Sequence, residues 1–100
     1  MRKLIVLIFL FLTFLYSCST NKTYLNRGNA YTNLGQYQQA IEDYTKAIML
    51  KPDYANTYNN RALVYLITKN TGSGCGDAQK ACELGNCATL QTARNKGLCR

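Results

Sequence analysis

Five cysteines are the most reactive side chains of this 100-residue chain, and histidine is absent from it. Acid–base and nucleophilic catalysis usually rely on a histidine or on two carboxylates that converge on one cleft. Among the five acidic residues, Glu42 and Asp43 are adjacent, but they fall on the surface of an expected helix, which is an ordinary solvated position. The sequence also has no Gly-rich phosphate loop. It therefore predicts neither an enzyme nor a cofactor-binding protein.

Four of the cysteines, Cys75, Cys82, Cys87 and Cys99, fall within the last 26 residues. They show no C-x₂-C spacing and have no histidine to complete a zinc set, so no metal site is expected. In an oxidising compartment, an even number of cysteines in a small domain indicates disulfides. The alternative is four free thiols that pack as small buried apolar side chains.

The fifth cysteine, Cys18, follows a segment with the order of a secretory signal. Arg2 and Lys3 precede an apolar run over residues 4–16, and small polar residues come next. Thirteen residues rise only about 20 Å as a helix, which is short of the roughly 30 Å hydrocarbon core of a bilayer. The pattern therefore favours export over a stable membrane span.

The segment Leu15-Tyr16-Ser17-Cys18 resembles the lipobox of bacterial lipoproteins, although Tyr16 is bulkier than is usual at its position. The resemblance implies that residues 1–17 are a signal peptide and that Cys18 becomes a lipidated N-terminus. A diacylglyceryl group and an amide-linked acyl chain would exceed the two signals needed for durable anchoring. The expected location is the cell envelope, with the protein facing an oxidising compartment. An ordinary cleavage site, or an uncleaved anchor, is the alternative.

Basic residues outnumber acidic ones, but they are scattered. Of the 12 lysines and arginines, two lie in the signal segment, which leaves ten against five acidic residues. Nucleic-acid binding requires a concentrated basic stripe, so a nucleic-acid partner is not expected. Contact with an anionic membrane surface remains compatible with this charge.

The chain matches itself when it is shifted by 34 residues. The recurring pairs are Tyr24 and Tyr58, Asn26 and Asn60, Arg27 and Arg61, Tyr31 and Tyr65, Asp43 and Asp77, Lys46 and Lys80, Ala47 and Ala81, and Leu50 and Leu84. This period and these residues resemble the tetratricopeptide repeat, a helical hairpin unit. The first repeat carries the family's signature at Tyr24, Arg27, Gly28, Tyr31, Tyr37, Ala40, Tyr44, Ala47 and Pro52.

The resemblance implies an all-α fold, an α-solenoid of two antiparallel helix-turn-helix repeats closed by a C-terminal capping helix. Small residues let the paired helices approach closely, and tyrosines fill the space around them. The expected segments are a linker at residues 18–21, repeats at 22–53 and 54–86, and a cap at 87–100. Helices are expected over about 22–34, 37–50, 54–68, 75–84 and 88–97, with Asp53 capping the third.

The glycines at positions 72, 74 and 76 interrupt the second repeat. Each costs roughly 1 kcal/mol inside a helix, so a long turn is expected before a short helix that begins at about Cys75. Two repeats and a cap are also few for this architecture, which usually needs about three repeats. Disulfides would supply the missing stability.

Helix geometry selects among the disulfide pairings. Cys75 and Cys82, seven residues apart on one helix, are separated by about 10.5 Å of rise, beyond the roughly 7 Å that a disulfide spans between Cα atoms. If the last two helices form a hairpin that turns at residues 85–86, then Cys82 and Cys87 flank the turn and Cys75 faces Cys99. The nested pairs Cys75–Cys99 and Cys82–Cys87 are therefore predicted.

The resemblance further implies a concave surface, made by the first helix of each repeat, that holds a peptide or protein segment. The residues expected on that face are Lys22, Leu25, Asn29, Asn33, Asn56, Asn59, Asn60, Leu63 and Ile67. The alternative is that these asparagines are simply solvated surface residues.

Some members of the family grip a peptide's C-terminal carboxylate with five side chains. This chain is similar at Asn29, Asn60 and Arg94, whereas Leu25 and Leu90 replace the two lysines of that clamp. A groove that uses amide hydrogen bonds and apolar contacts near Leu25 and Leu63 is therefore expected, with no small-molecule substrate. Two other possibilities stay open: an assembly subunit of an envelope complex that uses its convex or terminal surface, and a truncated relic of a longer repeat protein.

Overall fold

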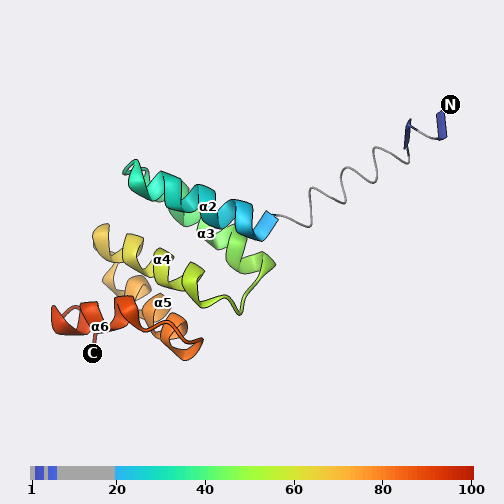
Figure 1. Cartoon of the computed structure of the whole chain (residues 1–100). Helices are drawn as coiled ribbons and strands as arrows, with labels where there is room; N and C mark the ends of the chain where they lie inside the picture. The colour runs from blue at the N-terminus through green and yellow to red at the C-terminus, as the bar shows by residue number, and fades with distance from the viewer. Residues whose placement is uncertain (1, 4, 7–19) are drawn as a thin grey trace.

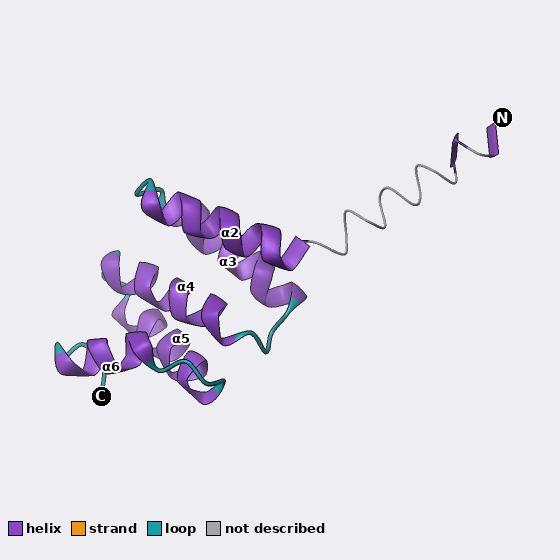
Figure 2. Ribbon diagram, viewed as in Figure 1, coloured by secondary structure: helices purple, strands orange, loops and turns teal. Residues whose placement is uncertain are grey.

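The computed structural model describes residues 2, 3, 5, 6 and 20–100 of the chain. Its order of elements is α2 (Thr20–Asn33), α3 (Tyr37–Leu50), α4 (Ala55–Ile67), α5 (Thr71–Glu83) and α6 (Ala88–Asn95). No strand occurs among these described residues, so the predicted all-α class is confirmed (Figure 2). Most of the expected signal peptide (residues 1, 4 and 7–17) and the lipid site at Cys18 lie outside the described residues.

The helices form two antiparallel hairpins and a cap, stacked in chain order (Figure 1). Helix α2 packs on α3, α4 packs on α5, and α3 joins the two hairpins through its contact with α4. Helix α6 lies against α4 and α5. As a result, α2, α4 and α6 begin at the same end of the molecule and share one face of it (Figure 1).

The first hairpin closes around Tyr44. This ring is 1% exposed and belongs to a core cluster with Ala40, Ala47 and Val64. Gly28 lies directly against it, because a Cβ atom at that position would come within 2.7 Å of the Tyr44 Cε1 atom. A glycine on α2 is therefore what allows the large ring on α3 to fill the space between the helices.

The second hairpin uses small residues and a residue from the cap instead. Ala62 and Ala78, both fully buried, form a second cluster with Leu90 of α6. Ala78 stands one repeat after Tyr44, so the second hairpin lacks the large ring. The capping helix therefore supplies core volume, and it is part of the folding unit.

Helix α5 begins earlier than its glycines predicted. It starts at Thr71 and not at about Cys75, so the expectation of a long turn before it was wrong. Gly74 is buried, and a Cβ atom there would lie 2.8 Å from the Leu66 Cδ2 atom and 3.2 Å from the Ala62 carbonyl oxygen. The close packing of α4 and α5 at this glycine offsets the low helix propensity of the segment.

The expected cap of α4 was also wrong. This helix begins after Tyr54, and no side-chain hydrogen bond caps it, so Asp53 does not have that role. Instead, the Tyr58 hydroxyl donates to the backbone carbonyl of Pro52 at 2.9 Å. This bond secures the turn between α3 and α4.

Both predicted nested disulfides are present. Cys75 and Cys99 are joined with their Cα atoms 5.6 Å apart, and Cys82 and Cys87 with theirs 4.0 Å apart. The first bond ties the end of the chain to α5, and the second closes the turn between α5 and α6. Together they fasten the eight-residue α6 at both ends.

Candidate functional site

The shared face of α2, α4 and α6 carries two adjoining hollows. The smaller, of ≈ 180 Å³, lies between α2 and α4, and the larger, of ≈ 450 Å³, lies between α4 and α6. Leu63 of α4 lines both of them, so the two hollows adjoin at this side chain. The residues of the smaller hollow are Asn29, Thr32, Asn33, Tyr44, Asn60 and Leu63.

A hydrogen-bond network forms the floor of the smaller hollow. The Asn29 Oδ1 atom accepts hydrogen bonds from the Tyr44 hydroxyl at 2.7 Å and from the Asn60 Nδ2 atom at 3.0 Å. The Tyr44 hydroxyl also lies 3.0 Å from the Thr32 Oγ1 atom. Burial raises the pKa of Tyr44, which keeps this hydroxyl neutral and able to donate.

The same network leaves two amide groups available. Within the described part of the chain, Asn29 Nδ2 and Asn60 Oδ1 have no hydrogen-bond partner. One is a donor and the other an acceptor, which is the pair of groups that a peptide bond requires. The hollow can therefore fix an extended backbone without any charged side chain.

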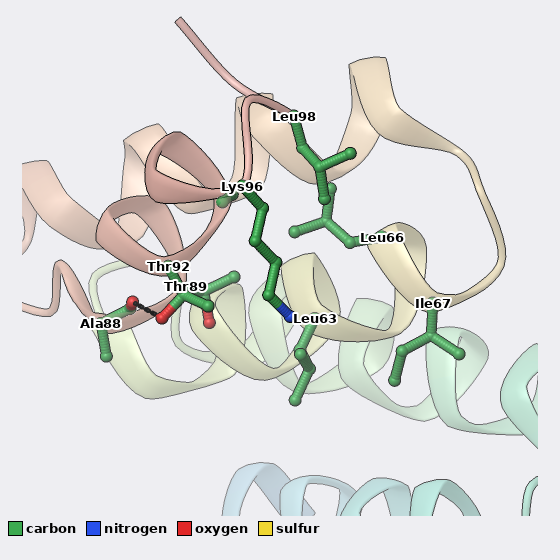
Figure 3. Close-up of a pocket in the computed structure, with 9 residues that line it drawn as sticks. Leu63, Leu66, Ile67, Ala88, Thr89, Thr92, Lys96 and Leu98 are labelled. Atoms are coloured by element: carbon green, nitrogen blue, oxygen red, sulfur yellow. Dashed lines mark hydrogen bonds between the residues drawn. The ribbon is translucent and has the colours of Figure 1, made fainter.

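The larger hollow is apolar and open to solvent. Leu63 and Ile67, both 46% exposed, line it from α4, and Leu98, 45% exposed, lines it from the segment after α6. Figure 3 shows these side chains around the depression, with the Lys96 side chain reaching across it toward Leu63. Large apolar side chains left exposed around one pocket are typical of a binding surface.

Helix α6 is held in place as a wall of this pocket by contacts with α4. The Asn59 Oδ1 atom accepts a hydrogen bond from the Thr89 backbone nitrogen at 3.1 Å, and the Asn59 carbonyl accepts one from the Thr89 hydroxyl at 3.4 Å. Leu90, 3% exposed, anchors the same helix in the core. These contacts fix the pocket independently of a ligand.

Each hairpin has an equivalent ion pair that joins its two helices. The guanidinium of Arg27 binds the Asp43 carboxylate through two bonds of 2.7 and 2.8 Å, and Arg61 binds Asp77 through bonds of 2.6 and 2.9 Å. In each case the carboxylate raises the pKa of the arginine. Arg61 also donates to the Thr45 hydroxyl at 3.0 Å, which links the two hairpins. All four charged residues recur at the period of 34, a signal from which the pairing could have been inferred.

Of the residues predicted for the groove, Asn29, Asn33, Asn60 and Leu63 line the smaller hollow, and Leu63 and Ile67 line the larger one. Leu25, Asn59 and Arg94 are used differently. Leu25 is only 8% exposed and belongs to the core, so it does not offer a groove contact.

Asn59 and Arg94 also depart from the expected arrangement. The Asn59 side-chain oxygen accepts a hydrogen bond from the start of α6, as described above, so Asn59 acts as a positioning residue. Arg94 lines neither hollow, and its Nε atom donates to the Arg100 carbonyl at 3.0 Å.

Sequence reasoning did not assign Leu66, Thr92, Lys96 and Leu98 to the site. Thr89, Thr92, Ala93 and Lys96 follow the i, i+3, i+4, i+7 spacing of one helix face, which was a usable signal. Leu98 follows the helix and was missed; its backbone nitrogen donates to the Ala93 carbonyl at 2.8 Å, and the neighbouring disulfide at Cys99 ties this segment to α5.

Two absences among the described residues concern metal binding and membrane spanning. These residues contain no group of three or more cysteine, aspartate or glutamate side chains that could hold a metal ion. No helix among residues 20–100 is both long and apolar enough to cross a bilayer.

Comparison with known proteins identifies the repeat unit. Residues 22–54 match the family model of the tetratricopeptide repeat. The first tetratricopeptide domain of Spaghetti (RPAP3), solved with the HSP90 peptide SRMEEVD bound, has a TM-score of 0.65 and 28% identity, covering 67% of this chain and 53% of its own.

Curated relatives match over the same region. Human serine/threonine-protein phosphatase 5 is 43% identical over 58 residues, which are 58% of this chain and 12% of the phosphatase. Human mitochondrial import receptor subunit TOM70 is 39% identical over 64 residues, covering 59% of this chain and 10% of the receptor. The chain therefore spans only a small part of the relatives that it matches, and the similarity concerns the repeats.

Proposed function

We propose that this chain is a tetratricopeptide-type protein-interaction module that holds an extended segment of a partner protein along the shared face of α2, α4 and α6. The observation that carries the proposal is the pair of adjoining hollows, one with free amide groups and the other an exposed apolar pocket. Such a surface offers backbone recognition and a side-chain pocket, and nothing that would perform a reaction.

The two halves have different tasks. In the smaller hollow, Asn29 and Asn60 would bind one peptide unit of the partner through donor and acceptor. In the larger hollow, Leu63, Ile67 and Leu98 would cover a bulky apolar side chain of the partner. Burial of such a side chain supplies roughly 1.5–3 kcal/mol, more than a neutral hydrogen bond. The pocket would therefore dominate affinity, and the amides would set the register.

The similarity to the Spaghetti (RPAP3) domain with its bound peptide supports a peptide as ligand. The residues of this chain favour a partner other than one that is bound through its C-terminal carboxylate. Leu25 and Leu90, which take the place of the clamp lysines, are buried, and Arg94 is bonded to Arg100. Lys96 is the cation that lines the pocket. An internal or terminal segment with one large apolar residue would therefore suit this groove.

The proposal includes a lipid anchor at Cys18. It is supported by the basic, apolar and small-residue order of residues 2–18, which predicts export and lipidation. Mass spectrometry of the protein from membranes should show diacylglycerol on Cys18, and Cys18→Ala should release the protein from the membrane fraction. A protein that retains Met1 and remains unmodified would disprove the anchor and leave the groove proposal intact.

Selection from a peptide display library on the oxidised protein tests the groove. We expect enriched peptides to share a bulky apolar residue and to lose about tenfold or more in affinity with Ile67→Ser, because burial of such a side chain has that magnitude. Leu34→Ser is the matched control, since Leu34 is exposed at the turn between α2 and α3 and lines neither hollow. Equal losses with both variants, or no dependence on Ile67, would refute the groove.

A further inference from the structure

One end of the first hairpin has a composition that the binding groove does not explain. Met49 and Leu50 at the end of α3 are 77% and 52% exposed. Lys46 lies one turn earlier on the same face of α3, and Lys51 follows the helix directly. Exposed apolar side chains thus stand beside two lysines at one tip of the molecule.

Aromatic rings complete this tip. The Lys46 Nζ atom lies 5.4 Å from the centre of the Tyr24 ring, and the Lys51 Nζ atom lies 5.2 Å from the centre of the Tyr54 ring. Both rings are half-buried and pack against the core of the first hairpin, so they are rigidly placed. Tyrosine, lysine and exposed aliphatic side chains together are the composition found at the interface between a bilayer and water.

The opposite tip of the same hairpin provides a contrast. Leu34 is exposed there as well, at 69%, but residues 28–41 contain no charged residue. The lysine-bearing tip also includes Lys22 in the first turn of α2, and its three lysines face two nearby acidic residues, Asp53 in the turn after α3 and Glu42 one turn before Lys46. The charge of this tip is therefore positive, which complements an anionic surface.

The position of α2 relates this tip to a membrane. Helix α2 begins at Thr20, two residues after the proposed lipid site at Cys18, and two residues of extended chain span at most about 7 Å. Because α3 runs antiparallel to α2, its last turn lies beside the first turn of α2 (Figure 1). A lipid on Cys18 therefore brings the tip formed by Lys46, Met49, Leu50, Lys51 and Tyr54 to the level of the headgroups.

We infer that this tip docks on the surface of an anionic phospholipid bilayer, so that the module stands on the membrane in one orientation. The inference rests on the lipid anchor proposed above. Met49 and Leu50 insert among the headgroups, and Lys46 and Lys51 contact lipid phosphates. Helix α4 also begins near this tip, and its 13 residues rise about 20 Å. Ile67, at the end of α4, therefore lies about 20 Å from the bilayer side of the molecule, which leaves its side of the apolar pocket open to a partner in the aqueous phase.

Tryptophan substitution tests the orientation, because the chain contains no tryptophan and a single one reports its own surroundings. The variants are Met49→Trp and, as the matched control at the opposite tip, Leu34→Trp. Each lipidated protein is reconstituted into vesicles of phosphatidylcholine with phosphatidylglycerol that contain brominated lipid. We expect quenching and a blue shift of the fluorescence for Met49→Trp, and neither change for Leu34→Trp.

Charge neutralisation is the second measurement. Adding Lys46→Gln and Lys51→Gln to Met49→Trp should lower the ratio of docked to undocked protein roughly fivefold per lysine, as a basic residue contributes a factor of that size at an anionic surface. Adding Lys69→Gln, an exposed lysine in the turn between α4 and α5 at the opposite end of the molecule, should leave the ratio unchanged.

Three results would overturn the inference. Proteins that fail to float with vesicles would exclude the anchor and the docking together. Proteins that float, but show equal quenching at both tips or none at Met49→Trp, would exclude the docking alone. A blue shift without vesicles that grows with protein concentration would assign the tip to contact with a second copy of the chain.

Discussion

Replacing Gly74 by alanine should separate the contribution of tertiary packing from that of helix propensity. Gly74 and Gly76 lie in the same helix, two residues apart, and differ in what an added methyl group would meet. At Gly74 it would come within 2.8 Å of Leu66 and 3.2 Å of the Ala62 carbonyl oxygen, whereas at Gly76 it would meet nothing within 4 Å. The two substitutions share one chemical change and differ in one contact.

The magnitudes follow from that geometry. Alanine is favoured over glycine inside a helix by about 1 kcal/mol, so Gly76→Ala should stabilise the protein by up to that amount. At Gly74 the same gain is opposed by an overpacking cost of about 1–3 kcal/mol, because the carbonyl oxygen belongs to the backbone of α4 and cannot rotate away. Gly74→Ala should therefore be less stable than Gly76→Ala by about 1–3 kcal/mol.

Thermal unfolding of the oxidised protein, followed by circular dichroism, measures this difference. For a domain of this size, 1 kcal/mol corresponds to roughly 4–8 °C in Tm. We expect Gly76→Ala to raise Tm and Gly74→Ala to lower it or leave it unchanged. A rise of equal size for both variants would show that α4 and α5 do not approach closely at Gly74, and would favour the turn that the glycines alone predicted.

Three further outcomes are expected. Replacing Cys75 and Cys99 with serine should cost about 3 kcal/mol in urea unfolding, because the disulfide closes a loop with a sequence separation of 24, and an unchanged midpoint would contradict this. Burial raises the pKa of Tyr44 above 10.0, so the folded state keeps a proton that the unfolded chain releases, and the free energy of unfolding should fall as the pH rises above that value. The fall should be shallower in Tyr44→Phe, and equal slopes would exclude the effect. Lys69 has a φ of 65°, so Lys69→Gly should raise the free energy of unfolding by about 0.5–1 kcal/mol, whereas a loss would show that the turn is unstrained.

The turn at Lys69 also shows how the repeat period carries information. Gly35, one repeat earlier, has a φ of 74°, and both turns close with the same backbone bonds: Gln36 donates to Tyr31, and Asn70 donates to Tyr65. The backbone conformation is thus preserved although the glycine is not. A period of 34 in the sequence predicted the hairpins correctly even where individual signature residues had changed.

The groove was predicted in part. Positions on the first helix of each repeat placed Asn29, Asn60 and Leu63 on one face, and the structure brings them together. Because Asn29 accepts the hydrogen bond of the buried Tyr44 hydroxyl, its removal would cost stability as well as binding. Periodicity gives the face on which a residue lies, but it does not reveal whether a neighbouring side chain already uses its polar group.

The all-α class, the repeat and the limits of α3 could be predicted from the sequence, because each depends on local spacing along a regular helix. The nested disulfides could be predicted as well, because helix spacing excludes Cys75–Cys82 and a hairpin that turns at residues 85–86 favours the nested pairs. The start of α5, the place of Leu25 in the core and the place of Leu98 in the pocket wall were set by tertiary packing. These features depend on which surfaces meet: the packing of α4 against Gly74 outweighs the helix propensity of its glycines, and a disulfide between residues 24 positions apart ties the segment that carries Leu98 to α5. Such contacts join residues distant in the chain, and no local pattern encodes the distance between them.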